Sequence, residues 1–225
     1  MNPTENSKKS AGYAAAGYVQ SGMVVGLGTG STVKYALEMI AKRIKNEGLD
    51  ILGIPTSEAT AGLAMKLGIP LSTLDEHPVL DMAIDGADEV DPGFNLIKGG
   101  GGAHTREKIV ATASKRFIVV VDKGKVVGKL GDFGIPIEVL PFGAGLVKRK
   151  IEGLGGTVKQ RNNTSDNGNM LMDARMEIRN PAELEDLLNS IPGVIENGIF
   201  AHRRPEVVIV GDGAGVVVIE REDGK

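Results

Sequence analysis

The stretch IDGADEVDPGFNLIKGGGGAHTREK, residues 84–108, decides the expected fold and the expected site. Asp85 and Asp88 come directly after the apolar run 79–84, where we expect a strand to end. Open α/β sheets bind their ligands at the carboxyl ends of the strands. The first part of the stretch therefore predicts a ligand site at the end of a strand.

The second part of the stretch adds a cation, a glycine run and a helix. Lys98 follows the short apolar run 95–97, and four glycines, 99–102, lead into a predicted helix over 103–115. The free N–H groups and the dipole at the start of a helix favour an anion. Glu107 lies one turn into this helix.

These residue types suit isomerisation of a sugar that carries a carbonyl group. A carboxylate such as Glu107 removes the proton beside the carbonyl, and Lys98 with the glycine backbone neutralises the resulting oxyanion. Asp85 and Asp88 would move protons between sugar oxygens. Each feature alone also has a plain structural interpretation, as a strand-to-turn sequence, a flexible loop or a helix surface.

The composition places the chain among globular proteins. It has 225 residues, 41% of them hydrophobic and 24% charged, and a net charge of −3. This charge gives no electrostatic reason to expect nucleic acid or an anionic membrane as a partner. The chain contains no run of 18 apolar residues, and its start, MNPTENSKKS, has no apolar segment of a secretory signal. We therefore expect a cytoplasmic protein without a membrane partner.

Metal and thiol chemistry are not expected. The chain has no cysteine, which excludes disulfides and thiolate catalysis. Its three histidines, His77, His104 and His202, are widely spaced and form no ligand pattern. We expect no metal and no cofactor, and we assign no role to His104.

A second glycine-rich loop, GLGTGST at 26–32, follows the apolar run 23–27. Its glycines expose N–H groups, the following helix adds positive potential, and Ser31 and Thr32 add hydroxyl donors. The dinucleotide motif would require glycine in place of Ser31, and the P-loop would require a lysine before it. The loop favours a phosphomonoester over NAD or ATP, and a tight turn without a ligand remains the alternative.

Strands and helices alternate through the first half of the chain. The predicted elements are helix 3–20, strand 23–27, a helix from the loop 26–32 to residue 45, strand 50–54, helix 57–67, strand 79–84, helix 103–115 and strand 117–121. This alternation is typical of a mostly parallel, doubly wound, Rossmann-like sheet. Lys125 follows the last of these strands and is expected near the same sheet edge, and a solvated surface lysine is the alternative.

The pattern changes after residue 131. Strand 135–140, helix 143–154, strands 157–161 and 169–176, helix 181–190 and strand 194–200 give the β-α-β-β-α-β order of a ferredoxin-like α+β domain. Its middle loop, 162–168, is expected to be polar and mobile, and the unit to serve as a cap or an assembly surface. The runs 206–210 and 216–220 predict a hairpin that returns to the first sheet. We therefore predict a catalytic domain of residues 1–131 and 204–225, with an inserted domain of residues 132–203.

Taken together, these motifs resemble the ribose-5-phosphate isomerase A family. GTGST at 28–32, DGADEVD at 85–91, KGGGGAHTREK at 98–108 and DKGK with Lys125 occur in the family's order. The resemblance implies interconversion of D-ribose 5-phosphate and D-ribulose 5-phosphate, in the non-oxidative pentose phosphate pathway, without metal or organic cofactor, by a homodimer or homotetramer.

The resemblance also implies roles for individual residues. Glu107 is the implied proton acceptor between C1 and C2, Asp85 and Lys98 assist ring opening and stabilise the enediolate, and Asp88 orients them. The implied substrate-binding residues are Thr29, Gly30, Ser31, Thr32, Asp85, Gly86, Ala87, Asp88, Lys98, Gly99, Gly100, Gly101 and Lys125. Lys8 either reaches the phosphate or is a solvated surface lysine.

A different class of function remains open at this level. Related α/β folds serve as effector domains of transcription regulators, so a non-catalytic sugar-phosphate sensor is the alternative. Such a sensor would need a DNA-binding module, and the sequence before the first predicted strand does not suggest one. Another aldose–ketose isomerase or a sugar-phosphate deaminase is a lesser alternative.

Overall fold

The computed structural model describes residues 3–213 and 215–222, which divide into two compact units. The first unit comprises Met1–Gly86, Arg106–Val126 and Pro205–Lys225, and the second comprises Ala87–Thr105 and Val127–Arg204. This division places residues 87–105 with the second unit. The boundaries near 131 and 204 stay a prediction from the sequence.

The first unit is built on a six-stranded sheet with the order β13-β12-β6-β3-β1-β2. Its strands are β1 (Val24–Leu27), β2 (Leu52–Pro55), β3 (Leu80–Asp85), β6 (Ser114–Asp122), β12 (Val207–Gly211) and β13 (Val216–Glu220). All neighbouring strands are parallel except β12 and β13, which are antiparallel. The predicted mostly parallel sheet and the returning hairpin are confirmed.

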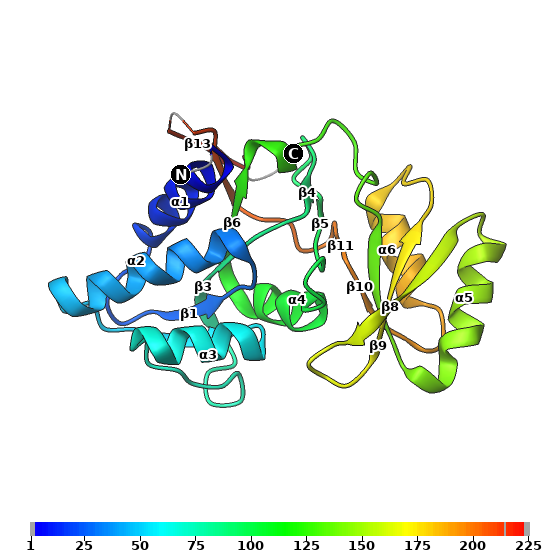
Figure 1. Ribbon diagram of the computed structural model, residues 1–225, viewed down its shortest axis with the longest axis horizontal. Coiled ribbons are helices and arrows are strands. Elements are labelled where there is room, and N and C mark those ends of the chain that lie inside the picture. Colours follow the sequence, from blue (N-terminus) through cyan, green and yellow to red (C-terminus); the bar gives the residue numbers. More distant parts are fainter. Residues whose placement is uncertain (1–2, 214, 223–225) are drawn as a thin grey trace. The chain divides into compact units, whose positions relative to one another are not determined.

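Four helices cover this sheet. They are α1 (Pro3–Ala16), α2 (Ser31–Glu47), α3 (Glu58–Leu67) and α4 (His104–Ala113). The first two residues of α4 belong to the second unit. Figure 1 shows α1 and α2 on one face and α3 and α4 on the other. Every residue of β6 from Phe117 to Val121 is at most 1% exposed, as expected for a strand that is buried on both faces.

Two glycines allow close packing in this unit. A Cβ atom on Gly12 of α1 would lie 2.8 Å from the backbone of α2 at Thr32 and Ala36, so the two helices cross with backbones nearly in contact. A Cβ atom on Gly26 of β1 would lie 2.4 Å from Cγ1 of Val110, so α4 packs directly on this strand. Larger residues at either position would force the layers apart.

The second unit contains the predicted ferredoxin-like arrangement. Its elements are β7 (Ile135–Val139), the 3-10 turn η2 (Pro141–Gly143), α5 (Ala144–Gly153), β8 (Thr157–Thr164), β9 (Met170–Arg175), α6 (Pro181–Asn189) and β10 (Val194–Asn197). The strand order is β10-β7-β9-β8, and all neighbours are antiparallel. The core of this sheet includes Ile137, Val147, Met172 and Leu188.

A three-stranded sheet in the second unit was not predicted. It consists of β4 (Glu89–Val90), β5 (Leu96–Ile97) and β11 (Ile199–Phe200), in the order β11-β5-β4. The single strand predicted over 194–200 is therefore wrong, because Gly198 divides it between two sheets. The Gly198 carbonyl accepts from the Lys98 N–H at 2.9 Å, and its N–H donates to the Pro136 carbonyl at 2.7 Å.

Several further boundaries differ from the sequence prediction. The first helix ends at Ala16 rather than at residue 20, since Gly17 begins a series of short i to i+3 turns. Helix α4 ends at Ala113, and β6 begins at the next residue, where the predicted helix would have continued to 115. Strand β8 extends to Thr164, so three of the seven residues of the polar loop predicted over 162–168 are strand.

Candidate active site

One group of the predicted site residues lies in the first unit, where the chain reverses its direction of travel across the sheet. From β1 the chain crosses to β2 on one side, and from β2 it crosses back to β3 on the other side. Ligands of open parallel sheets bind at the carboxyl ends of the strands at such a switch point. The loop after β1 and the residues Asp85 and Gly86 at the end of β3 occupy this position.

The carboxylate of Asp85 is held by backbone N–H groups at this point. Oδ1 accepts hydrogen bonds from the N–H of Thr29 at 3.0 Å and from the N–H of Gly86 at 2.7 Å. Only 2% of Asp85 is exposed. The two bonds fix the orientation of the carboxylate, and they bring together two of the segments that the sequence singled out.

The glycine at position 28 makes room for this carboxylate. A Cβ atom there would lie 2.2 Å from Oδ1 and 2.6 Å from Cα of Asp85. Part of the GLGTG motif is therefore explained by a contact inside the protein. The next glycine, Gly30, has φ +128° and precedes α2 without a side-chain cap.

The start of α2 retains the features expected of an anion site. The first hydrogen bond of the helix runs from the Lys34 N–H to the Gly30 carbonyl at 3.1 Å, so the N–H groups of the first turn have no acceptor within the helix. Ser31 is exposed and Thr32 is buried. The helix is 17 residues long, and its dipole places partial positive charge at this end.

Four hydroxyl groups join the loop after β1 to the start of α3. Oγ1 of Thr29 lies 2.8 Å from the hydroxyl oxygens of Thr56 and Ser57 and 3.2 Å from that of Thr60. The Thr60 hydroxyl donates to the Gly28 carbonyl at 2.9 Å, and Ser57 caps α3 by accepting from the Thr60 N–H. This cluster fixes the backbone at Thr29, whose N–H donates to the Asp85 carboxylate.

Two other predicted residues belong to the first unit. Glu107 lies in the first turn of α4 and is 5% exposed. Lys125 lies in a short 3-10 turn, η1 (Lys123–Lys125), directly after β6, and is half-buried. Since β6 neighbours β3, this lysine follows the carboxyl end of a strand next to the Asp85 strand.

The second unit carries the predicted lysine. Lys98 follows β5, and only 2% of it is exposed. Its Nζ atom lies 5.5 Å from the ring centroid of Phe200, a distance at which an ammonium group is attracted to the face of an aromatic ring. An ammonium group buried in this way acts in a medium of low dielectric constant, where its charge is felt strongly.

The glycine run of the second unit is held in one conformation. The Gly102 N–H donates to the Gly99 carbonyl at 2.9 Å, which closes a turn, and both of these residues have positive φ angles. Oδ2 of Asp88 accepts from the Gly100 N–H at 2.7 Å. Arg161 donates from Nη1 to the carbonyls of Gly99 at 2.9 Å and Gly100 at 3.1 Å.

Two residues whose roles were left open have contacts in the structure. His104 is fully buried, and its Nε2 atom lies 3.3 Å from the Glu196 carbonyl oxygen. A Cβ atom on Gly99 would lie 2.6 Å from the imidazole Nδ1, so the histidine packs against the turn. Nζ of Lys8 lies 3.3 Å from Oε1 of Glu5.

A buried carboxylate anchors the beginning of α4. Oε2 of Glu138 accepts from the Thr105 hydroxyl at 2.5 Å, and Oε1 accepts from Ser165, Asn167 and Asn169 at 2.7, 3.1 and 2.8 Å. Burial raises the pKa of Glu138, but these hydrogen bonds outweigh it and hold the pKa below its ordinary value of 4.5. Thr105 precedes Glu107 by two residues in the same helix.

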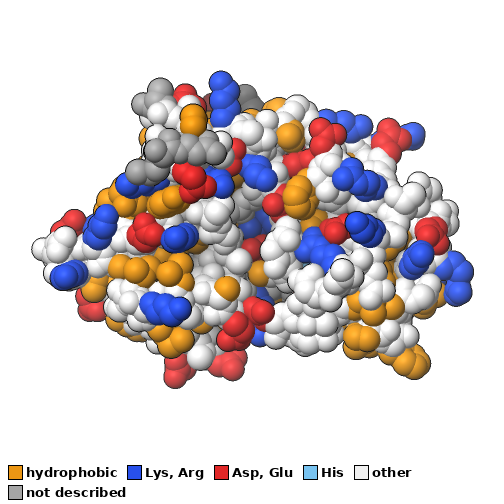
Figure 2. All heavy atoms as spheres, in the orientation of Figure 1, with side chains coloured by type: hydrophobic (Ala, Val, Ile, Leu, Met, Phe, Trp, Pro, Cys, Tyr) orange, Lys and Arg blue, Asp and Glu red, His pale blue; other side chains and the backbone are white. Residues whose placement is uncertain are grey.

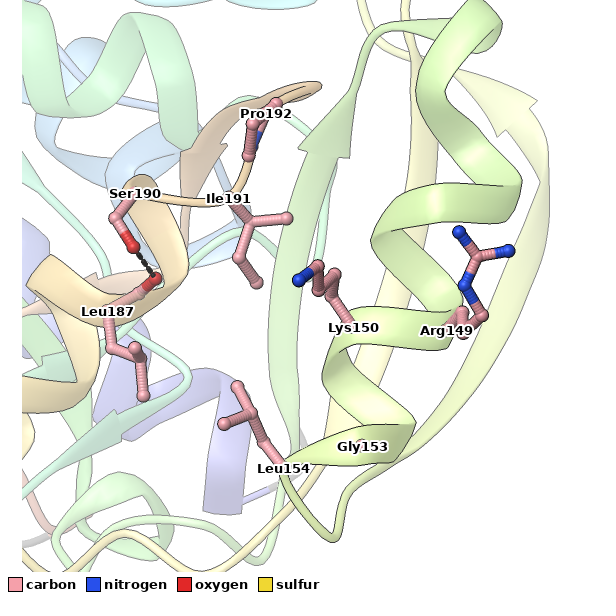
Figure 3. Close-up of a pocket in the computed structure, with 8 residues that line it drawn as sticks. All are labelled: Arg149, Lys150, Gly153, Leu154, Leu187, Ser190, Ile191 and Pro192. Carbon is pink, nitrogen blue, oxygen red and sulfur yellow. Dashed lines mark hydrogen bonds between the residues drawn. The ribbon is translucent and has the colours of Figure 1, made fainter.

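A pocket elsewhere in the second unit carries none of the predicted site residues. It has a volume of about 420 Å³ and lies between the ends of α5 and α6 (Figure 3). Its lining consists of Arg149, Lys150, Gly153, Leu154, Leu187, Ser190, Ile191 and Pro192. This lining contains no carboxylate, and its one hydroxyl, on Ser190, donates to the Leu187 carbonyl at 2.7 Å.

Within residues 3–213 and 215–222, no three His, Cys, Asp or Glu side chains lie together in a way that could hold a metal ion. None of the helices there has the length and apolar character needed to cross a membrane. Acidic and basic side chains are interspersed over the face seen in Figure 2.

Sequence reasoning missed several residues that support the candidate site. Arg161 and Glu138 fall within predicted strands, and Thr56 and Thr60 flank the start of a predicted helix. Ser57 is a residue type that is favoured at the N-cap, and it marks the start of this helix. No local signal in the sequence indicates that Arg161 or Glu138 has partners far along the chain.

Comparison with known proteins identifies a family for this chain. A family model described as ribose 5-phosphate isomerase A (phosphoriboisomerase A) matches residues 52–215. The chain is 51% identical over 215 residues to ribose-5-phosphate isomerase A of Thermosynechococcus vestitus, with 91% of each chain covered. It is 46% identical over 222 residues to that of Methanothermobacter thermautotrophicus, with 95% of this chain and 97% of the relative covered.

Solved structures give the same result. Ribose 5-phosphate isomerase A from Methanocaldococcus jannaschii superposes with a TM-score of 0.91 at 44% identity, covering 95% of this chain and 98% of that one. A D-ribose-5-phosphate isomerase in complex with phospho-erythronic acid superposes with a TM-score of 0.94 at 41% identity, covering 98% of this chain and all of the other.

Proposed function

The chain belongs to the ribose 5-phosphate isomerase A family, and we propose that Glu107 is the base with which it performs the family's reaction. The protein is an aldose–ketose isomerase that interconverts D-ribose 5-phosphate and D-ribulose 5-phosphate. We place this reaction in the non-oxidative pentose phosphate pathway.

Proton transfer is the first task of the site. Glu107 removes the proton from C2 of the open-chain aldose, which leaves an enediolate, and returns it to C1 to give the ketose. The hydroxyl proton moves from O2 to O1 in the same cycle, so the reaction is balanced without an external oxidant or reductant. The position of Glu107 in the first turn of α4, which Thr105 ties to Glu138, supports this assignment.

Stabilising the enediolate is the second task. The Lys98 ammonium group and the backbone of the glycine run 99–102 offset its negative charge. Asp85 and Asp88 transfer protons between the sugar oxygens, and Asp85 assists ring opening with Lys98. The burial of Lys98 supports this role, because its charge acts most strongly on a neighbouring oxyanion in a medium of low dielectric constant.

The phosphate group needs a separate anion site. We place it at residues 29–32, where the N–H groups and hydroxyls at the start of α2 can donate to its oxygens. Lys125 adds a positive charge that follows the carboxyl end of β6. The one observation that carries this proposal furthest is the Asp85 carboxylate, fixed by the Thr29 and Gly86 N–H groups at the switch point of the sheet.

The relative bound to phospho-erythronic acid suggests a ligand for testing this site. That acid has a phosphate group at one end and a planar, delocalised carboxylate at the other, which resembles a planar enediolate in charge and shape. We expect it to inhibit this chain competitively. Failure to inhibit at millimolar concentration would argue against the enediolate site.

Glu107→Gln tests the assignment of the base. The variant should keep the wild-type unfolding temperature and lose at least about 10²-fold in kcat, the lower end of the usual contribution of a positioned general base. NMR of ribose 5-phosphate in D2O with EDTA present should show exchange of the C2 proton with the wild type and none with the variant. Glu152→Gln, an exposed carboxylate of α5, is the matched control. Near-full turnover by Glu107→Gln would remove this residue from the mechanism.

The assembly and location of the protein are also proposals. We propose a homodimer or homotetramer in the cytoplasm, with a sugar phosphate as its only ligand and with no nucleic acid or membrane partner. Analytical ultracentrifugation distinguishes the two assemblies from a monomer.

A further inference from the structure

The four consecutive glycines at 99–102 pose a physical problem for an active site. Glycine has the largest backbone freedom of all residues, so peptide groups between glycines rotate easily. A backbone N–H group stabilises an oxyanion only when it is oriented before the reaction. Something other than the glycines themselves must therefore fix the direction in which these N–H groups point.

An arginine on β8 supplies that constraint. Arg161 forms a bidentate ion pair with Asp173 of the neighbouring strand β9. The distances are 2.9 Å from Nε to Oδ2 and 2.6 Å from Nη2 to Oδ1. Its side chain is only 13% exposed. The remaining nitrogen, Nη1, donates to the carbonyls of Gly99 and Gly100.

These bonds determine where the N–H groups of the turn point. In a trans peptide group the C=O and N–H bonds point in opposite directions. The Gly99 carbonyl faces the guanidinium, and the N–H of the same peptide group, on Gly100, donates to Asp88. The Gly100 carbonyl also faces the guanidinium, so the Gly101 N–H points away from it.

The Gly101 N–H is the donor that this arrangement leaves available. Gly101 is exposed, and its N–H makes no hydrogen bond to any residue that the structure describes. The cationic group on the carbonyl side polarises the adjoining peptide groups and makes their N–H groups stronger donors.

We propose that Arg161, which its ion pair with Asp173 holds in place, is a positioning residue for the glycine turn. It orients the turn so that the Gly101 N–H donates to an oxygen of the sugar. This inference rests on the proposed function, since it assigns a substrate oxygen to that N–H. Arg161 acts through the turn. It is the point at which the ferredoxin-like sheet contributes to the chemistry.

The test compares Arg161→Met and Arg161→Lys with the wild type. Removing one oxyanion donor costs about 10²–10³ in kcat, so Arg161→Met should lose about 10²-fold in kcat with little change in KM. Arg161→Lys should lie between the two, because a point charge cannot pair with both Asp173 oxygens and reach both carbonyls. Guanidinium ion should partly restore the kcat of Arg161→Ala in a saturable manner, which a general loss of stability would not permit.

Arg175→Met is the matched control. Arg175 lies on the same strand as Asp173, donates to the Asp132 carbonyl and has no contact with the glycine turn. The Arg175→Met variant should keep the wild-type kcat. The second readout is the amide resonance of Gly101 in a 15N NMR spectrum without substrate, which should shift in Arg161→Met and stay in place in Arg175→Met.

The outcomes separate this inference from the proposed function. An Arg161→Met variant whose kcat stays within twofold of the wild type, or whose Gly101 amide resonance is unchanged, overturns the positioning role, whereas the isomerase reaction stands. Absence of turnover by the wild-type protein itself would instead overturn the proposed function.

Discussion

Replacement of Glu138 by glutamine should destabilise the second unit in a pH-dependent way. The carboxylate is fully buried and accepts hydrogen bonds from four residues. A hydrogen bond to a charged group contributes about 1.5–3 kcal/mol, and one between neutral groups about 0.5–1.5 kcal/mol. The amide oxygen of glutamine can keep the three donors on one side, and the Thr105 hydroxyl can rotate to accept from the amide nitrogen.

The glutamine side chain lacks the charge of Glu138 but keeps its hydrogen-bond partners, and the expected change in the free energy of unfolding follows from this. The four bonds each weaken by about 1 kcal/mol. Removing a buried charge also removes its desolvation cost, which offsets part of this loss. We therefore expect a net decrease of about 2 kcal/mol in the free energy of unfolding, or about 4–8 °C in Tm for a chain of this size.

The direction of the pH dependence follows from the depressed pKa of Glu138. Because the folded-state pKa lies below the ordinary value of 4.5, the stabilisation is fully present above that pH and is lost as the pH falls through the folded-state pKa. The Tm difference between wild type and Glu138→Gln should be full at neutral pH and shrink below about pH 4.5.

Differential scanning calorimetry between pH 3.5 and 7.5 measures this difference. Glu152→Gln is the control, because Glu152 is half exposed and lies 3.9 Å from Lys148, so it should change Tm by less than about 1 °C. A Tm difference that is the same at every pH, or absent at pH 7, would refute the role assigned to the carboxylate.

Further predictions concern three glycines. Gly28→Ala places a Cβ atom 2.2 Å from Oδ1 of Asp85, so the carboxylate must move, and kcat should fall by about 10²-fold in a steady-state assay. A kcat within twofold of the wild type would show that the position of this carboxylate is unimportant. Gly62→Ala in the interior of α3 adds a Cβ atom in open space and should raise the free energy of unfolding by about 0.5–1 kcal/mol. Gly68→Ala at the end of the same helix, where φ is +77°, should lower it by about 1–2 kcal/mol. Urea denaturation measures both, and changes of equal sign would contradict the reasoning.

Local patterns in the sequence were sufficient to predict the main architecture. The apolar runs that became β1 and β3 end at glycine and aspartate, so the residues that follow them could be assigned to one edge of a parallel sheet. The contact between Thr29 and Asp85 agrees with that reasoning. The order of strands and helices after residue 131 was sufficient to predict the ferredoxin-like sheet.

Features that depend on distant partners could not be predicted. Strands β4, β5 and β11 are two residues long, too short to show a periodic pattern, and exist through pairing with one another. Glu138 has the sequence appearance of a solvent-facing strand residue, but its partners lie 27 to 33 positions away in the chain. The same holds for Arg161, whose contacts with the glycine turn span about sixty residues.

The interleaving of the two units has a consequence for biosynthesis. Strand β6 pairs with β3 on one side and with β12 on the other, and residues 127–204 of the second unit lie between β6 and β12 in the chain. A ribosome therefore releases that whole segment before the last partner of β6 appears. Until then the nascent sheet has an open edge that other chains can pair with. Chaperone protection during translation is thus most valuable in the interval between the synthesis of β6 and that of β12.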